Sequence, residues 1–209
     1  VLITAGPTYE AIDPVRFIGN HSSGKTGVAL AEECLKRGAE VYLIMGPSAQ
    51  TLPERPGLYL SRVTSAAEML ESVKKVYEKA DYFILSAAVA DFAPANPQTQ
   101  KIKKTAQNLE LNLIRTPDIA AFLGSSKSGS QKLIGFALET ENLHENAISK
   151  MKNKNMDMIV LNSTGEDGSG FGEDFNRVEI LTRSGGHISP GKKSKKDLAT
   201  DIVNALVHL

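Results

Sequence analysis

The residues best suited to chemistry near the start of the chain form a glycine-rich stretch, Gly19-Asn20-His21-Ser22-Ser23-Gly24-Lys25-Thr26, which fits the phosphate-binding pattern GxxxxGK[ST]. In a P-loop this pattern follows the first strand directly, so that its amides wrap the phosphates at the start of a helix. Here thirteen residues, two of them prolines, separate Ala5 at the end of the first apolar run from Gly19. The apolar run at residues 82–88 carries no acidic residue that could hold magnesium. The pattern is therefore a weak indication of a P-loop, and a P-loop kinase or NTPase stays open as an alternative.

The same segment still favours an anion. Small residues precede and open a predicted helix at residues 24–37, and backbone N–H groups at a helix start attract negative charge. These small residues are Ser22, Ser23, Gly24 and Gly27. The alternative is a plain helix cap whose glycines serve close packing. A dinucleotide site is a weaker interpretation, because the glycine spacing is not GxGxxG and Gly46 follows the second strand where an acidic ribose ligand is expected.

Further candidates are charged residues later in the chain. Asp91 follows a predicted strand, at the edge where parallel sheets bind ligands. Lys150 and Lys154 are four residues apart and share one face of a predicted helix, although a solvated face would give the same pattern. The histidines are His21, His144, His187 and His208. Their scatter along the chain predicts no metal cluster.

Alternating strands and helices must position these candidates. Apolar runs bounded by turn residues predict strands at residues 1–5, 41–45, 82–88, 132–138 and 158–161. Spacing and capping signals predict helices at residues 24–37, 65–79 and 142–154, and Ser65 with Glu68 forms a capping box. A short helix is expected with Pro117 as its first residue. The last helix places Leu198, Ile202, Ala205 and Leu209 on one face. This order predicts an α/β, Rossmann-like three-layer fold with a mostly parallel sheet.

The other segments are less regular. Residues 92–100 are rich in Pro, Ala and polar residues and predict a loop. The alternation of Leu109, Leu111 and Leu113 with polar residues predicts a half-exposed strand. Four glycines at residues 165–175 predict a long loop, and residues 178–181 and 187–189 predict a hairpin.

The composition argues against several classes of protein. Lys and Arg total 24, as do Asp and Glu, and this balance argues against a non-specific nucleic-acid binder. No apolar run approaches the roughly 20 residues of a membrane helix. The single cysteine, Cys34, cannot form an intrachain disulfide, and without a visible secretion signal we expect a cytoplasmic setting. The 209 residues fit one large domain, 1–209.

Several short stretches, in a fixed order, are more specific than any of these patterns alone. They are Ile3-Thr4-Ala5-Gly6-Pro7-Thr8, Ile12-Asp13-Pro14-Val15-Arg16, Asn20-His21-Ser22-Ser23-Gly24-Lys25, Ala87-Ala88-Val89-Ala90-Asp91-Phe92, Lys101-Ile102-Lys103-Lys104, Pro117-Asp118-Ile119, Gly135-Phe136-Ala137, Glu139-Thr140, Lys150, Lys154-Asn155 and Gly170-Phe171-Gly172. In this order they resemble the bacterial phosphopantothenate–cysteine ligase family over nearly the whole chain.

The resemblance implies a reaction and its partners. Such enzymes are ligases, unrelated to the ATP-grasp enzymes, that join 4′-phosphopantothenate to cysteine in coenzyme A biosynthesis. The bacterial type uses CTP and Mg²⁺: the carboxylate attacks the α-phosphate to give an acyl-cytidylate and pyrophosphate, and the cysteine amine then displaces CMP. The resemblance also implies a homodimer with an irregular dimerisation extension. In many bacteria a flavin-dependent decarboxylase domain precedes this one, while no nucleic-acid or membrane partner is expected.

The resemblance assigns nucleotide contacts to individual residues. Lys101, Lys150 and Lys154 match nucleotide-binding lysines, and Asp91 and Phe136 match contacts to the nucleoside. The other nucleotide contacts implied are Gly6, Ser22, Gly24, Gly27, Ser86, Ala87, Pro117, Asp118, Ile119 and Ala120.

The resemblance also implies substrate and catalytic residues. Asn20 matches the residue that holds the acyl-nucleotide intermediate, where an amide can donate to a developing oxyanion, and Lys101 is its predicted catalytic partner. Arg16 matches a substrate-phosphate contact supplied by the neighbouring subunit. The small residues Ala87 and Ala88 allow substrate to approach the backbone closely. A non-catalytic module that only holds a phosphorylated ligand is the alternative from another class of protein.

Overall fold

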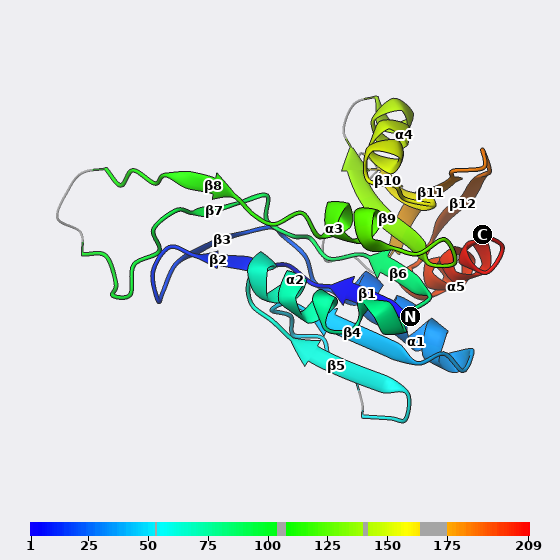
Figure 1. Cartoon of the computed structure of the whole chain (residues 1–209), viewed down its shortest axis with the longest axis horizontal. Helices are drawn as coiled ribbons and strands as arrows, with labels where there is room; N and C mark the ends of the chain where they lie inside the picture. Colours follow the sequence, from blue (N-terminus) through cyan, green and yellow to red (C-terminus); the bar gives the residue numbers. More distant parts are fainter. Residues whose placement is uncertain (53, 104–107, 140–141, 164–174) are drawn as a thin grey trace.

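A central eight-stranded sheet organises the chain in a computed structural model, which describes residues 1–52, 54–103, 108–139, 142–163 and 175–209 (Figure 1). In sheet order the strands are β12 (His187–Ser194), β11 (Phe175–Thr182), β10 (Met158–Ser163), β9 (Lys132–Glu139), β6 (Tyr82–Leu85), β1 (Leu2–Ala5), β4 (Val41–Met45) and β5 (Leu58–Arg62). All neighbours from β10 to β5 pair in parallel, and β11 and β12 add an antiparallel edge. Counted along the chain, the parallel strands have the order 3-2-1-4-5-6 of a Rossmann sheet.

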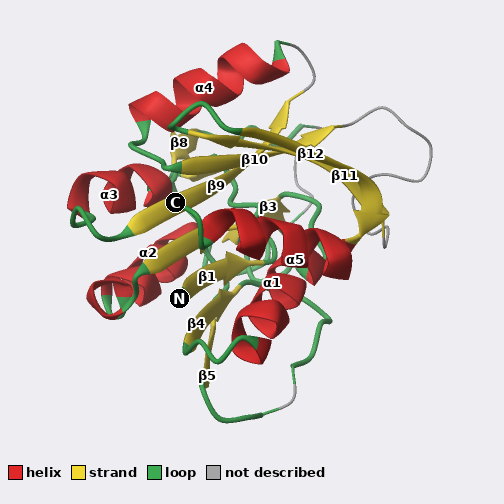
Figure 2. Ribbon diagram, turned by 90° about the vertical axis from the view of Figure 1, so that its right-hand side faces the viewer, coloured by secondary structure: helices red, strands yellow, loops and turns green. Residues whose placement is uncertain are grey.

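Helices cover both faces of this sheet (Figure 2). On one face α1 (Lys25–Lys36) packs beside α5 (Lys195–Leu206), and the other face carries α2 (Ala66–Lys74), α3 (Ile119–Ser126) and α4 (Leu143–Asn153). Successive strand side chains point to opposite faces, so each buried strand feeds two cores. Ile3 packs with α1 and α5, whereas its neighbour Leu2 packs with the other three helices. The expected three-layer α/β fold is confirmed.

A two-part arm reaches away from the main sheet (Figure 1). We define the arm as residues 9–19, with the pair β2 (Tyr9–Ala11) and β3 (Phe17–Gly19), and the described residues of 92–115, with the pair β7 (Phe92–Pro94) and β8 (Leu113–Arg115). The buried carboxylate of Asp13 joins the two parts, because it accepts hydrogen bonds from the backbone N–H of Arg16 and of Ile102. The guanidinium of Arg16 bonds the same carboxylate and holds the pKa of Asp13 well below its ordinary value. The thirteen residues between the first strand and the glycine-rich stretch therefore mostly build the arm.

Several predicted boundaries need correction. Residues 92–100 were expected as a loop but contain β7, which pairs with β8 and not with the core sheet. The predicted strand with Leu109, Leu111 and Leu113 begins only at Leu113, and all three leucines are exposed. Pro117 does not open α3, because Asp118 is the N-cap and its side chain accepts from the N–H of Ala121.

The helix expected at residues 65–79 ends earlier than predicted. Its start is confirmed, since Ser65 and Glu68 form the full capping box, but α2 stops at Lys74 and a separate 3₁₀ turn covers Tyr77–Lys79. The sequence reasoning missed β2, β3 and the edge strand β5 altogether. The expected loop at residues 165–175 lies outside the described residues except for Phe175, which begins β11, and so do Lys104, Thr140 and the Gly170-Phe171-Gly172 stretch.

Two further expectations concern the single cysteine and membrane-spanning helices. Cys34 packs in the core of α1 at 3% exposure, and burial raises the pKa of its thiol to about 11, so it is a packing residue and no nucleophile. None of the described helices is long and apolar enough to cross a membrane.

Candidate functional site

A cavity of about 960 Å³ opens at the carboxyl ends of the parallel strands. Its lining comes from residues 20–27 before and within the start of α1, residues 85–92 from the end of β6 to the start of β7, residues 115–120 from the end of β8 into α3, and residues 135–138 on β9. Thr4 of β1 faces Leu85 of β6 in the sheet and also lines the cavity. The order of the parallel strands reverses between β1 and β6, and this is the point at which open α/β sheets bind their ligands.

The start of α1 lies directly over the end of β1. Gly24 caps the helix with a φ of 77°, in the left-handed region that favours glycine. A Cβ on Gly27 would lie 2.3 Å from the Cβ of Ala5 and 2.8 Å from Oγ of Ser86, so the helix can approach the strands this closely only without a side chain at that position. Gly24 has no side chain to cap the first turn, and residues 24–27 of that turn line the cavity, so the positive end of the helix dipole lies at the cavity wall.

Hydrogen bonds fix the segment that follows β6. Oγ of Ser86 donates to the carbonyl of Thr4 at 2.7 Å, and the N–H of Ala90 donates to Oγ1 of Thr8 at 3.0 Å. Nδ2 of Asn20 donates to the carbonyl of Val89 at 2.9 Å, which orients the Asn20 amide at the cavity wall. These three hydrogen bonds therefore tie the segment after β6 to β1, to the turn that follows β1 and to Asn20.

Lys150 and Lys154 both line the cavity, although their spacing alone favoured a solvated face. Nζ of Lys150 donates to the carbonyl of Phe136 at 3.2 Å. Lys154, which caps α4, forms an ion pair with Asp118 at 2.8 Å. Desolvation alone would raise the pKa of Asp118, but the hydrogen bonds from Lys154 and from backbone amides outweigh it and lower that pKa. Lys154 thus meets the cavity as part of a pair, with its charge partly neutralised.

The structure brings most of the predicted site residues together. The cavity lining includes Asn20, Ser22, Gly24, Gly27, Ser86, Ala87, Ala88, Asp91, Pro117, Asp118, Ile119, Ala120, Phe136, Lys150 and Lys154. Gly6 lies behind this wall with a φ of 75°, packed against Gly46. Arg16 and Lys101 are also outside the lining. Arg16 contacts Asp13 and donates to the carbonyl of Ile102 at 3.1 Å, so it lies on the arm beside the exposed Lys101.

Some residues of the cavity were missed in the sequence. Asn162 near the end of β10 and Asn176 near the start of β11 are hydrogen-bonded to each other at 2.8 Å and line one side. Arg115 at the end of β8 adds a cation, and Lys195 at the start of α5 adds another. Asn162 could have been found by the rule that residues at the carboxyl ends of parallel strands bind ligands. The other three depend on the antiparallel edge and the arm, which that rule does not cover.

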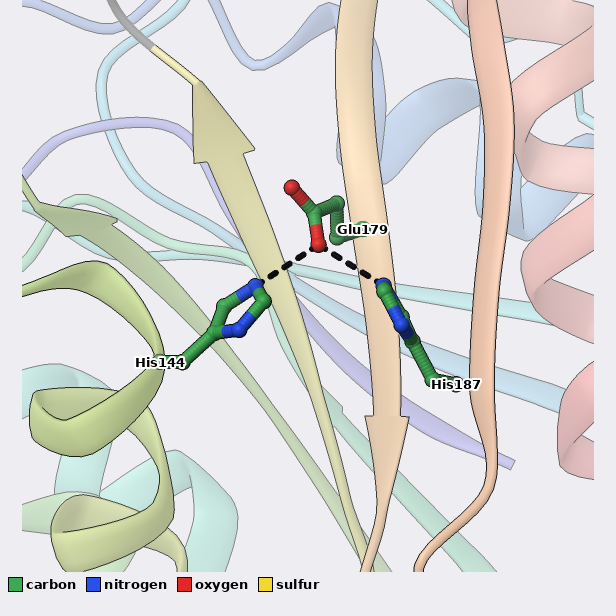
Figure 3. A group of neighbouring side chains, drawn as sticks. All are labelled: His144, Glu179 and His187. Carbon is green, nitrogen blue, oxygen red and sulfur yellow. Dashed lines mark hydrogen bonds and ion pairs between the residues drawn. The ribbon is translucent and has the colours of Figure 1, made fainter.

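The prediction that the histidines form no cluster is wrong for two of them. His144 and His187 both contact Glu179, outside the cavity (Figure 3). The three residues are 35 and 8 positions apart in the chain, a separation without any short motif for sequence reasoning to detect.

Comparison with known proteins gives consistent matches over the whole chain. The family described as the DNA/pantothenate metabolism flavoprotein C-terminal domain matches residues 1–209. A relative named Cysteine/Cysteine sulfinic acid decarboxylase, from an unknown prokaryotic organism, is 46% identical over all of this chain and 58% of its own length. The Coenzyme A biosynthesis bifunctional protein CoaBC of Bacillus subtilis is 44% identical over all of this chain and 51% of its own length.

A solved structure agrees with these relatives. The crystal structure of the C-terminal domain of Coenzyme A biosynthesis bifunctional protein CoaBC has a TM-score of 0.82 and 40% identity, covering 98% of this chain and 92% of its own. The chain spans only 51% to 58% of the two curated relatives described above. By the match over its whole length, the chain belongs to the family of the DNA/pantothenate metabolism flavoprotein C-terminal domain.

Proposed function

We propose that this chain is a CTP-dependent ligase that joins 4′-phosphopantothenate to cysteine through an acyl-cytidylate, in coenzyme A biosynthesis. The observation that carries the proposal is the cavity itself. It combines the start of α1, the two lysines Lys150 and Lys154, and the amide of Asn20 held by its hydrogen bond. The chain around it matches the C-terminal domain of CoaBC. We place residues 1–209 in one domain, and a cytoplasmic location goes with this proposal.

The first step needs charge neutralisation around a triphosphate. The carboxylate of 4′-phosphopantothenate attacks the α-phosphorus of CTP, and the bond to the β-phosphate oxygen breaks to release pyrophosphate. The amides at the start of α1 and the ammonium of Lys150 are placed to stabilise the negative charge of this step. Mg²⁺, when bound, would neutralise further phosphate charge, and the carboxylate of Asp91 in the lining is of the kind that holds it.

The second step forms the amide bond. The cysteine amine attacks the acyl carbon of the acyl-cytidylate, the bond to the phosphate oxygen breaks, and CMP leaves. Negative charge builds on the acyl oxygen in this step, and an N–H of Asn20 can donate to it. The hydrogen bond from Asn20 to the carbonyl of Val89 holds the amide in place beforehand, so that little reorganisation is needed.

Choice of CTP over ATP would depend on the wall that faces the base. Residues 117–120 lie at the start of α3, where main-chain groups can hydrogen-bond the edge of a cytosine. Phe136 is half-buried beside them and its carbonyl is held by Lys150.

The arm supports a homodimer in this proposal. Large apolar side chains are exposed on it: Val15 at 60%, Phe17 at 50%, Phe92 at 46% and Ile114 at 53%. Apolar surface of this kind favours burial against a partner. Arg16 and Lys101 lie on the same arm and outside the cavity, so a second copy is needed to bring Arg16 to a substrate phosphate. A flavin-dependent decarboxylase domain elsewhere in the full-length protein would account for the remaining length of the relatives.

The test is a coupled measurement of pyrophosphate and amide product. Wild-type protein given 4′-phosphopantothenate, cysteine and either CTP or ATP is expected to release pyrophosphate with CTP. Asn20→Asp is expected to keep releasing pyrophosphate but to form little amide. Asn204→Asp, the same change on α5 and outside the cavity lining, where the side chain accepts from Arg37, is the matched control. If the wild type releases no pyrophosphate with either nucleotide, the chain is a binding module and no ligase. If Asn20→Asp turns over normally, the role given to Asn20 is wrong.

A further inference from the structure

Three side chains from three elements meet on the outer part of the sheet, away from the cavity (Figure 3). His144 belongs to the first turn of α4, Glu179 to β11, and His187 begins β12. Nε2 of His144 lies 2.8 Å from Oε2 of Glu179, and Nε2 of His187 lies 2.7 Å from the same oxygen. The two rings cross nearly at right angles, at 78°, with centroids 5.5 Å apart.

The fold explains why these residues meet. Leu181 pairs with His187 across β11 and β12, and Glu179 lies two positions from Leu181. The side chains of Glu179 and His187 therefore point to the same face of the sheet as Leu181. Leu181 packs in the core under α2, α3 and α4. That face is the one that α4 covers, and the helix starts where His144 can reach the strands. The meeting follows from strand register and helix placement, not from any local motif.

The chemistry of the three groups is that of a metal site. Two imidazole nitrogens and one carboxylate oxygen form a ligand set preferred by Zn²⁺ and its first-row neighbours. The three ligand atoms lie within 4.8 Å of one another. Ligand atoms about 2.0–2.2 Å from a tetrahedral ion are about 3.3–3.5 Å apart, so each Nε2 needs to move from Glu179 by less than about 1 Å. Each ring would bind through Nε2 and keep its proton on Nδ1.

The side chains are free enough to make this adjustment. His144 is 52% exposed, His187 49% and Glu179 26%, so an ion can enter from solvent and water can occupy a fourth position. As a mere surface ion pair the cluster would contribute little to stability. The ligase reaction uses none of the three residues either, which leaves their convergence on one oxygen without another role.

We propose that His144, Glu179 and His187 bind a divalent transition-metal ion of the Zn²⁺ type, which fastens the first turn of α4 to β11 and β12. The consequence reaches the cavity, because α4 also carries Lys150 and is capped by Lys154. Holding the start of α4 to the sheet edge restricts the helix that presents both lysines. An ion bound only to the folded state also stabilises it in proportion to its free concentration.

The experiment titrates the whole chain, made without a polyhistidine tag and freed of metal with a chelator, with ZnCl₂ by calorimetry and with CoCl₂ by visible absorption. We expect one Zn²⁺ per chain, a higher melting temperature with Zn²⁺, and a Co²⁺ spectrum of low coordination number. MgCl₂ is expected to produce none of these changes, because Mg²⁺ prefers oxygen ligands in octahedral geometry.

Variants locate the ion. His144→Gln and His187→Gln are each expected to weaken Zn²⁺ binding by at least about tenfold, since each removes one of three ligands. His208→Gln, at an exposed position beyond α5, is the matched control and should bind as the wild type does. The proposal is overturned if the wild type binds no stoichiometric Zn²⁺, or if the double variant of His144 and His187 binds it with unchanged affinity. Neither result depends on whether the chain is a ligase.

Discussion

Replacing Gly27 by alanine should destabilise the protein and loosen its cavity at the same time. The added methyl carbon would lie 2.3 Å from Cβ and 3.2 Å from Cα of Ala5, and 2.8 Å from Oγ of Ser86. Carbon atoms in contact prefer about 3.5–4.0 Å, so α1 has to retreat from β1 by about 1 Å or more. Ala5 is part of a strand paired on both sides, and cannot give way by a side-chain rotation.

Two opposing effects set the change in the free energy of unfolding. Overpacking a rigid core costs about 1–3 kcal/mol, and the upper end applies here because the clash involves a strand. Alanine in place of glycine returns up to about 1 kcal/mol through helix propensity. The net loss of about 2 kcal/mol corresponds to a melting temperature lower by about 4–8 °C for a chain of this length.

Thermal unfolding followed by circular dichroism measures this effect. Gly129→Ala is the control, because a Cβ there meets no atom within 4 Å, and it should unfold within about 0.5 kcal/mol of the wild type. The KM for the nucleotide should rise in Gly27→Ala alone, since the amides at the start of α1 move away from the phosphates. A melting temperature of Gly27→Ala indistinguishable from that of the control would refute the close approach of α1 to β1.

Three other predictions concern single side chains. Lys101→Ala should lower kcat/KM for CTP more than Lys25→Ala does, and the reverse order in steady-state kinetics would favour a P-loop enzyme. Ser65→Ala should cost about 1 kcal/mol in urea unfolding through loss of the capping box, and an unchanged midpoint would contradict the cap. Asp118 has its pKa lowered below 3.8 in the folded state, so its charge stabilises the fold above that pH and the benefit disappears as the pH falls. The melting-temperature gap between wild type and Asp118→Asn should therefore shrink in acid, and a gap that grows in acid would reverse the assigned sign.

The sequence predicted the structure well for strands buried on both faces and for helix starts set by neighbouring residues. The run at residues 41–45 became β4 with the same bounds, because a strand buried on both faces is apolar at every position. The helix starting near Gly24 and the cap at Ser65 were also predicted correctly, since capping depends on residues within one turn. The edge strand β5 was missed because four of its five residues are exposed, and the arm strands β2, β3 and β7 were missed because each has only three residues.

The sequence by itself determined the layered fold and the start of α1, because periodicity and capping act over a few neighbouring residues. Asp91 was indicated by the rule for strand ends in parallel sheets, and the other predicted residues of the cavity mostly by the resemblance to a known family. Only the tertiary structure decided that Lys154 pairs with Asp118, that Arg16 lies on the arm beside Lys101, and that His144 and His187 meet on Glu179. Contacts of this kind join segments far apart in the chain, so they depend on strand order, register and helix placement, which no local pattern contains.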